Sequence, residues 1–319
     1  MLKYSIKRLL QSLVTVFIVI TLVFLLMRLL PEEGYFGDGY DKLTPEQREN
    51  ILRKFGLLDP WYIQLRNFYS SLLKGDLGKS IIYRPDVPVI DIIKLKIPFS
   101  AAFGLAAICV SLFFGLTMGI HMARNKGRFW DKVWSSYVVF INAVPAAVYL
   151  LFIQLYITGL KFRGRSIFPM LFNRHDPRSW ILPLISMSLG GIAGYALWMR
   201  RYMVDQLNQD YIRLARAKGM SDKQIMVKHV MRNAFVPMAQ YLPASVLLTI
   251  SGSIYIESLY SIPGMGGLLV DVIQRQDNVM VQALVLIYST LGIWGLFLGD
   301  ILMAIFDPRI RLEKREGAR

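Results

Sequence analysis

Six apolar runs, separated by polar segments, follow one another along the chain. They cover residues 9–30, 98–123, 133–160, 179–199, 235–259 and 281–306. A helix needs about 20 mostly apolar residues to cross a bilayer, and every run reaches that length. The pattern therefore predicts six membrane-spanning helices. Helix-breaking residues inside the runs predict kinks and close helix contacts in a bundle; they are Pro145, Pro183, Pro237, Pro243, Gly190, Gly191 and Gly194.

The first run follows Lys3, Lys7 and Arg8 and so resembles a secretory signal peptide. Its apolar part is longer than the roughly 7–15 residues typical of a signal peptide. Residues 28–34 offer no small-residue cleavage site. We therefore expect this run to stay attached as a span.

The composition supports a membrane protein. Of 319 residues, 54% are hydrophobic, which is more than ordinary soluble domains carry. The net charge of +15 could indicate nucleic-acid binding. The basic residues lie mainly in connecting segments, however, so membrane topology explains them and we expect no nucleic-acid partner.

Lys and Arg residues in the short connecting segments predict the orientation. Twenty lie in segments 1–8, 124–132, 200–234 and 307–319, against five in 161–178 plus Arg275. Since short cytoplasmic segments carry the excess of basic residues, both termini are expected in the cytoplasm. Segment 161–178 conflicts with this rule, because it is expected outside although it carries five basic residues and only one acid, Asp176.

The long segment 31–97, expected outside, has the signals of a small helical insertion. Thr44 and Gln47 fit a capping box around Pro45, and Gly56 can end that helix. Asp59-Pro60 is expected to begin a second helix. Apolar residues at helical spacing mark an amphipathic face of that helix, which we expect to pack into a core; they are Leu65, Phe68, Tyr69, Leu72 and Leu73.

The polar segment 210–233, between the fourth and fifth runs, is predicted to be structured. Asp210 is expected to cap a helix over residues 211–218, and Gly219 to end it. Ser221 and Gln224 then fit a second capping box. A helix of about eight residues is marginal in isolation. We therefore expect it to dock into a cleft on another protein; its apolar residues Ile212, Leu214, Ala215 and Ala217 alternate with the basic Arg213, Arg216 and Lys218.

The same segment resembles the cytoplasmic coupling loop of ATP-binding-cassette (ABC) importer permeases. That family's motif is Glu-Ala-Ala, three residues, Gly, nine residues, then Ile-x-Leu-Pro. Ala215 and Gly219 keep its spacing, whereas Arg213 and Leu214 replace the glutamate and first alanine. The form RxARAKG followed by HxxRNA is similar to the peptide and nickel permease branch, in particular its B-type subunit. The resemblance assigns these coupling residues: Asp210, Tyr211, Arg213, Leu214, Ala215, Arg216, Ala217, Lys218, Gly219, Met220, Ser221, His229, Arg232 and Asn233.

A second candidate site lies between the last two spans. The stretch ESLYSIPGMGGLLVDVI, residues 257–273, contains a sharp turn and resembles the same place in peptide permeases, as does the ending 307–311. By that resemblance the turn lies near an outer gate, with Glu257, Pro263, Gly264 and Gly266 as its candidate residues. A glycine-rich turn is otherwise usually only a turn.

The resemblance implies an all-α integral membrane protein: six transmembrane helices of the ABC type I importer permease fold, with a helical extracytoplasmic insertion. The chain divides into 1–30, the insertion 31–97, a core 98–306 that includes the coupling loop 200–234, and a cytosolic tail 307–319. Expected partners are a second, C-type permease subunit, two cytoplasmic ATPases and an extracytoplasmic peptide-binding protein. The expected location is a prokaryotic cell membrane.

Other chemistry is sparse in the sequence. Gly78-Lys79-Ser80 resembles the end of a phosphate-binding loop, but Leu73 stands where its first glycine is required. We therefore expect ATP hydrolysis by partners only, and neither a catalytic site nor a cofactor in this chain. Three scattered histidines predict no metal cluster. The single cysteine, Cys109, is expected to be a small core residue.

Three alternatives remain open. The nearest is a nickel or metal-chelate importer of the same family. An ion-coupled secondary transporter or channel would use intramembrane acids; Glu257 and Asp300 lie near span ends, where each could pair locally, and neither has a regularly spaced partner for a proton relay. A non-transporting membrane scaffold is the third.

Overall fold

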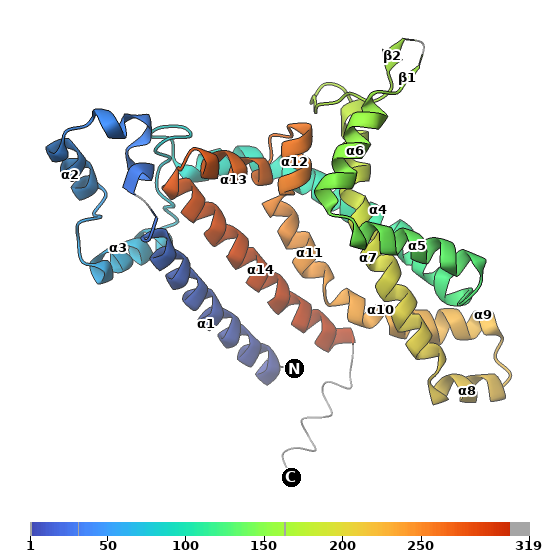
Figure 1. Cartoon of the computed structure of the whole chain (residues 1–319). Coiled ribbons are helices and arrows are strands. Elements are labelled where there is room, and N and C mark those ends of the chain that lie inside the picture. Colours follow the sequence, from blue (N-terminus) through green and yellow to red (C-terminus); the bar gives the residue numbers. More distant parts are fainter. Residues whose placement is uncertain (1, 31, 163, 307–319) are drawn as a thin grey trace.

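The computed structural model describes residues 2–30, 32–162 and 164–306. Almost all of its regular structure is helical (Figure 1). The elements are α1 (Leu2–Met27), η1 (Glu32–Tyr35), η2 (Gly37–Lys42), α2 (Pro45–Lys54), α3 (Trp61–Leu73), α4 (Val89–Arg124), α5 (Phe129–Ala143), α6 (Ala146–Thr158), β1 (Lys161–Phe162), β2 (Arg165–Ser166), α7 (Arg178–Leu207), α8 (Asp210–Ala217), α9 (Asp222–Ile225), the π-helical η3 (Met226–Met231), α10 (Arg232–Ala239), α11 (Leu242–Leu248), η4 (Thr249–Ser251), α12 (Ile254–Tyr260), α13 (Met265–Gln274) and α14 (Asn278–Phe306).

Five stretches are long and apolar enough to cross a membrane, and a bent pair of helices makes a sixth. Four are the single helices α1, α4, α7 and α14, as predicted. The fifth is the stretch 242–260, which contains α11 and α12. The sixth is the pair α5 and α6, bent by 106°. Six spans are therefore confirmed as candidates, but the third and fifth runs are not continuous helices.

The two broken spans have different causes. In the third, Pro145 follows Val144, which adopts an extended conformation because a residue before proline avoids the helical region. In the fifth, α11 passes into the 3₁₀ turn η4 and then Gly252, whose φ of 71° interrupts the helix before α12. The span expected at 235–259 therefore consists of three short helices.

The helices extend beyond the apolar runs. Helix α4 begins at Val89 rather than at 98 and carries Pro98 inside it, and α7 continues to Leu207. Polar residues on these extra turns lie beyond the apolar part. Hydropathy therefore located the spans but not the ends of their helices.

The bundle has two ends (Figure 1). At one end lie the start of α1, the end of α14 and the α8–α9 segment; at the other lie α2, α3, α13 and the β1–β2 hairpin. An ion pair of 3.3 Å between Arg8 and Asp300 joins α1 to α14 at the first end. Residues 2–8 and 200–234 thus share one end, and α2 and α3 of the insertion lie at the opposite end.

Glycines set the close approach of α4 and α7. A Cβ at Gly119 would lie 2.6 Å from the Ala196 carbonyl oxygen, and one at Gly191 would lie 2.4 Å from Ser111 Oγ. Small residues let two backbones approach in this way within membranes. The expectation of close contacts is correct for Gly191 and wrong for Gly194, where a Cβ would meet nothing within 4 Å.

The insertion contains both predicted helices. The capping box of Thr44 and Gln47 is present, and Gly56 has a φ of 66° after α2. The second helix, α3, begins directly after Pro60, as expected, and Pro60 at the N-cap makes no side-chain cap hydrogen bond.

The apolar face of α3 packs against the first span. Phe68 lies 5.0 Å from Phe24 and Tyr69 lies 5.4 Å from Phe17, measured between ring centroids. Leu73 is an exception to the predicted face, since it is 88% exposed. The insertion therefore uses α1 as its support.

Cys109 is exposed rather than buried, which corrects the sequence-based expectation. It lies on α4 in one row with Leu105 and Phe113, four residues before and after it, and both are exposed. This row forms an outer face of the bundle. An apolar face of a spanning helix can be exposed to lipid, so residue type alone did not indicate burial.

Candidate functional site at the α8–α10 segment and the outer turn

Helix α8 begins one residue earlier than predicted. Gln209 is its N-cap residue, in extended conformation, so Asp210 is the first helical residue and not a cap. The Asp210 carboxylate instead pairs with Arg213 at 3.2 Å, where both side chains are at least 80% exposed. A carboxylate in the first turn still interacts favourably with the helix dipole.

The turn after α8 follows the sequence prediction. Gly219 has a φ of 78°, and Ser221 with Gln224 forms the expected capping box at the start of α9. Helix α9 then continues into the π-helical η3. Short π-helical segments inside helices often occur at functional sites.

A local core holds α8 in place. Ile212 and Ala215 are buried in a cluster with Met203 of α7, Val230 of η3 and Ala234 of α10. Two of the four apolar residues expected to dock on another protein therefore face inward. Packing against this core stabilises a helix that is too short to be stable in isolation.

The outward side of α8 carries the remaining residues. Leu214 is 56% exposed, and Arg213, Arg216, Ala217 and Lys218 are exposed around it. This outward side has one large apolar residue surrounded by cations. Surface patches of this kind suit a partner that offers a pocket with an acidic rim.

Polar contacts join α8 to the start of α10. Asn233 donates from Nδ2 to the Tyr211 hydroxyl at 3.0 Å, and the Tyr211 hydroxyl donates to Gln206. The rings of Tyr211 and His229 lie 6.3 Å apart. The structure thus brings together Tyr211, His229 and Asn233, and Arg232 beside them is exposed.

Sequence reasoning missed an ion pair beside this segment. Arg200, near the end of α7, donates to both oxygens of Asp131 at 2.6 and 2.7 Å, and the Gly127 amide donates to the same carboxylate. Asp131 is 3% exposed. No local pattern links residues so far apart, so a single sequence contains no signal for this contact.

The second candidate site, the turn at residues 257–267, is built around the carboxylate of Glu257, which is 2% exposed. One oxygen accepts from Ser100 Oγ at 2.7 Å and from the Ser253 amide at 3.3 Å. The other accepts from the amides of Gly266 at 2.6 Å and Gly267 at 3.1 Å. Glu257 therefore pairs locally and joins α4, α12 and α13.

The glycines of this turn make room for that carboxylate. A Cβ at Gly264 would lie 2.4 Å from the Glu257 carboxyl carbon, and one at Gly266 would lie 2.7 Å from the Ser253 backbone. Ser261 just before them has a left-handed φ of 55°. The predicted sharp turn is confirmed, and Pro263 lies at its tip.

A second buried carboxylate was missed. Asp277, 0% exposed, accepts at Oδ2 from Ser80 Oγ at 2.6 Å and from the amides of residues 81–83 at 3.0–3.1 Å. Successive amides that converge on one anion form a nest. This nest follows directly on residues 78–80, which were rejected as a phosphate-binding loop, and the anion it holds is this chain's own Asp277.

An aromatic groove of about 430 Å³ runs between α7 and the α10–α11 segment. Gly191 and Gly194 lie on one wall with Tyr195, and Trp198 and Tyr241 are 44% and 58% exposed. The open space beside Gly194 therefore belongs to this groove.

In the described ranges, no group of three or more His, Cys, Asp and Glu side chains is placed to hold a metal ion. His121 accepts from Trp134 at 3.2 Å, and His229 lies beside Tyr211.

These features define the class of protein: a multi-pass membrane protein whose helices pack through glycines and carry a folded polar segment at one end. Two family models match the chain. The "Binding-protein-dependent transport system inner membrane component" model matches residues 115–312, and the corresponding N-terminal model matches residues 1–92. The chain belongs to this family of transport-system membrane components.

Similar proteins agree with this assignment. The oligopeptide transport system permease protein OppB of Haemophilus influenzae is 36% identical over 98% of this chain and all of that protein. The dipeptide transport system permease protein DppB of Lactococcus lactis is 33% identical over the same shares. A solved amino acid ABC transporter has 17% identity and a TM-score of 0.51 over 69% of this chain and 94% of that chain, so it supports the fold alone.

Proposed function

We propose that this chain is a B-type transmembrane subunit of an ATP-driven ABC importer of peptides. The observation that carries the proposal is the similarity, over nearly the whole chain, to permeases named for oligopeptide and dipeptide transport. The chain itself is a non-enzymatic component. Partner ATPases hydrolyse the ATP.

The proposed assembly contains a second, C-type permease subunit, two cytoplasmic ATPases and an extracytoplasmic peptide-binding protein. Each permease subunit supplies half of the translocation pathway. The α8 end of the bundle faces the cytoplasm of a prokaryotic cell, and segment 31–97 faces outward as an insertion on the core 98–306. The excess of basic residues in the segments at the α8 end supports this orientation.

The outward side of α8 is the proposed contact with an ATPase. Leu214 would enter a pocket, and Arg213, Arg216 and Lys218 would face its rim. The inward side supports this role, because Ile212 shares a core with Met203 of α7 and Ala234 of α10. A push on α8 would therefore move two spans together.

ATP binding would draw the ATPases together and shift the bundle between two arrangements. The aromatic groove beside Gly194 would line this chain's half of the passage, since aromatic faces accept varied side chains and exposed backbone next to glycine leaves room for a peptide. The outer turn around Glu257, Pro263, Gly264 and Gly266 remains a candidate outer gate.

The experiment substitutes Gly219 in the assembled transporter. A valine at φ near +78° strains the turn by about 1–3 kcal/mol without a steric contact, since nothing lies within 4 Å of its Cβ. Gly219→Val is expected to reduce peptide uptake while ATP hydrolysis continues. Gly127→Val is the matched control: its φ is 77° and its Cβ also meets nothing, but it lies in another loop.

Unchanged uptake in Gly219→Val, or an equal loss in Gly127→Val, would contradict the coupling role. Labelled dipeptide and nickel are offered in parallel. Uptake of nickel alone would assign the chain to the metal-importing branch, and uptake that follows the proton gradient after ATP is removed would contradict an ABC mechanism.

A further inference from the structure

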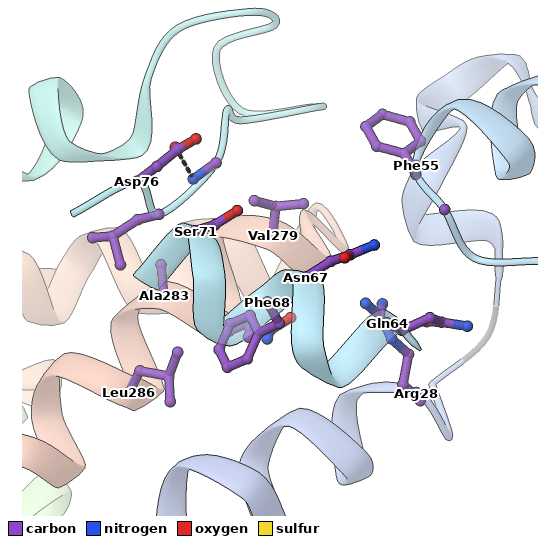
Figure 2. A pocket seen from close by; sticks show the side chains of 14 residues that line it. Arg28, Phe55, Gln64, Asn67, Phe68, Ser71, Asp76, Val279, Ala283 and Leu286 are labelled. Atoms are coloured by element: carbon purple, nitrogen blue, oxygen red, sulfur yellow. Dashed lines mark hydrogen bonds between the residues drawn. The ribbon is translucent and has the colours of Figure 1, made fainter. Parts of the chain in front are cut away.

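A pocket of about 240 Å³ lies between the end of α1, helix α3 and the start of α14 (Figure 2). It is at the insertion's end of the bundle, away from the aromatic groove. Figure 2 shows Arg28 and Gln64 together at one end of the pocket and Ala283 and Leu286 at the other. The pocket therefore has a polar end at Arg28 and Gln64, whereas its other end combines Ala283 and Leu286 with the polar Ser71 and Asp76.

The polar end contains two shielded groups that have no hydrogen-bond partner among the described residues: Nε of Arg28 and Oε1 of Gln64. Both side chains are fixed by their other atoms. Arg28 donates to the Tyr35 hydroxyl at 2.8 Å, and Gln64 donates to the carbonyls of Leu57 at 3.0 Å and Asp59 at 2.7 Å. One donor and one acceptor are thus held in place without partners, an arrangement that is rare in native proteins.

The surroundings place this pocket at the level of lipid headgroups. Arg28 directly follows the span of α1; Leu26 at the end of that span and Leu29 just after it are 55% and 80% exposed. Helix α3, which packs on α1 through Phe68 and Tyr69, exposes Trp61 and Tyr62 by 62% and 58%. Aromatic residues of this kind are enriched where membrane meets water.

We propose that this pocket binds a phospholipid headgroup that carries a primary amine. The phosphate, an anion, accepts from Arg28, whose guanidinium suits phosphate geometry. The amine donates to Gln64 Oε1. The acyl chains follow the apolar wall of Phe68 and Leu286 toward the exposed side of α1.

A lipid fits this pocket better than a transported peptide does. The pocket adjoins the exposed leucines of α1, whereas the proposed passage lies between α7 and α11. A peptide would also have to bind beside a hydrophobic surface that the bilayer covers. The lipid therefore holds the insertion against the bundle from the leaflet on the insertion's side.

The test measures lipids retained by the purified full-length chain, using native mass spectrometry. The chain is offered phosphatidylethanolamine and phosphatidylcholine in equal amounts; their phosphates are alike, but only the first has N–H donors on its amine. Wild type is expected to retain one phosphatidylethanolamine, preferred by about tenfold, which is the factor that one hydrogen bond supplies. An octapeptide is added in a second arm as a competitor.

Two substitutions separate the two headgroup contacts. Arg28→Gln should reduce retention of both lipids by about tenfold or more, because it removes the charge that meets phosphate. Gln64→Lys keeps donors toward the Leu57 and Asp59 carbonyls and removes the acceptor, so the preference between the lipids should vanish. Ser71→Phe fills the pocket from α3 without touching either residue and should also abolish retention.

The matched control is Arg48→Gln. Arg48 lies in the insertion, as Gln64 does, and like Arg28 has a shielded Nε without a partner among the described residues, but it does not line the pocket. It should leave retention unchanged. Melting temperatures within a few degrees of wild type show that a variant has folded.

Three results would overturn the proposal. They are a wild-type chain that retains neither lipid, which would mean that water fills the pocket; an equal loss in Arg48→Gln; and displacement of the lipid by the octapeptide. A preference for phosphatidylethanolamine that survives in Gln64→Lys would contradict the amine contact.

Discussion

The insertion's end of the bundle and the α8–α9 segment at the other end hold their carboxylates in opposite ways. At the insertion's end, Glu257 and Asp277 are buried and accept hydrogen bonds from serine hydroxyls and backbone amides of distant elements. At the other end, Asp210 and Asp222 are at least 90% exposed and make only surface ion pairs.

The buried carboxylates therefore hold parts of the fold together, whereas the exposed ones lie on a surface where a partner can bind. Removing such a buried carboxylate leaves several shielded amides without acceptors, which costs about 1–3 kcal/mol of stability for each donor. An exposed ion pair contributes about 0–1 kcal/mol. The insertion's end therefore resists rearrangement, and the α8–α9 segment offers a surface.

Asp277→Ala should have the largest effect. It removes the carboxylate that accepts from the Ser80 hydroxyl and from the amides of residues 81–83, which connect the insertion to α14. We expect a loss of at least about 3 kcal/mol in unfolding free energy and rapid proteolysis of the insertion. Asp271→Ala, at an exposed position of α13, is the control and should change stability by less than about 0.5 kcal/mol.

Glu257→Gln should have the next largest effect. Glutamine has nearly the shape of glutamate, but an NH₂ group replaces one acceptor oxygen. That group then faces other donors, either the amides of Gly266 and Gly267 or the amide of Ser253. We expect a loss of about 1–3 kcal/mol, measured as a lower melting temperature in detergent. A variant as stable as wild type would contradict the close pairing at this turn.

Replacing each of two glycines of α7 by valine should distinguish a role in helix packing from a role in peptide passage. Gly191→Val places a Cβ against Ser111 of α4 and should destabilise the chain by about 1–3 kcal/mol. Gly194→Val faces open space, so stability should change little, while uptake of peptides with bulky side chains should fall. Equal melting temperatures for the two variants would contradict the assigned helix contact.

Leu214→Asp should have the smallest effect on stability. Leu214 is mostly exposed, so we expect a change below about 0.5 kcal/mol. Binding of the ATPase should weaken by about tenfold, because replacing a central apolar contact commonly costs more than about 1 kcal/mol. Isothermal titration of the ATPase onto the permease in nanodiscs measures this, and unaltered binding would remove Leu214 from the interface.

Much of the fold could be predicted from the sequence because hydropathy and capping are local. The apolar runs located the spans, and the pairs Thr44 with Gln47 and Ser221 with Gln224 marked two helix starts correctly. The break at Pro145 was predicted as a kink, but its size depends on how α5 and α6 pack. Asp210 was wrong as a cap, because Gln209 holds the cap position.

The candidate sites were predictable only in part. The turn around Gly219 followed from residue types, but the inward orientation of Ile212 and Ala215 depends on α7 and α10. The carboxylate nest joins Asp277 to Ser80, 197 positions away, because the folded chain brings the end of the insertion against the start of α14. Contacts between residues so far apart along the chain produce no periodic pattern that a single sequence could reveal.

Site-directed crosslinking tests the proposed contact between α8 and an ATPase. Cys109 is the only cysteine in the sequence, so Cys109→Ser provides a cysteine-free background. Leu214→Cys at α8 and Lys161→Cys at the opposite end are compared in the assembled transporter. We expect a crosslink to the ATPase from position 214 and none from position 161; no crosslink from 214, or equal crosslinking from both, would contradict the proposed contact.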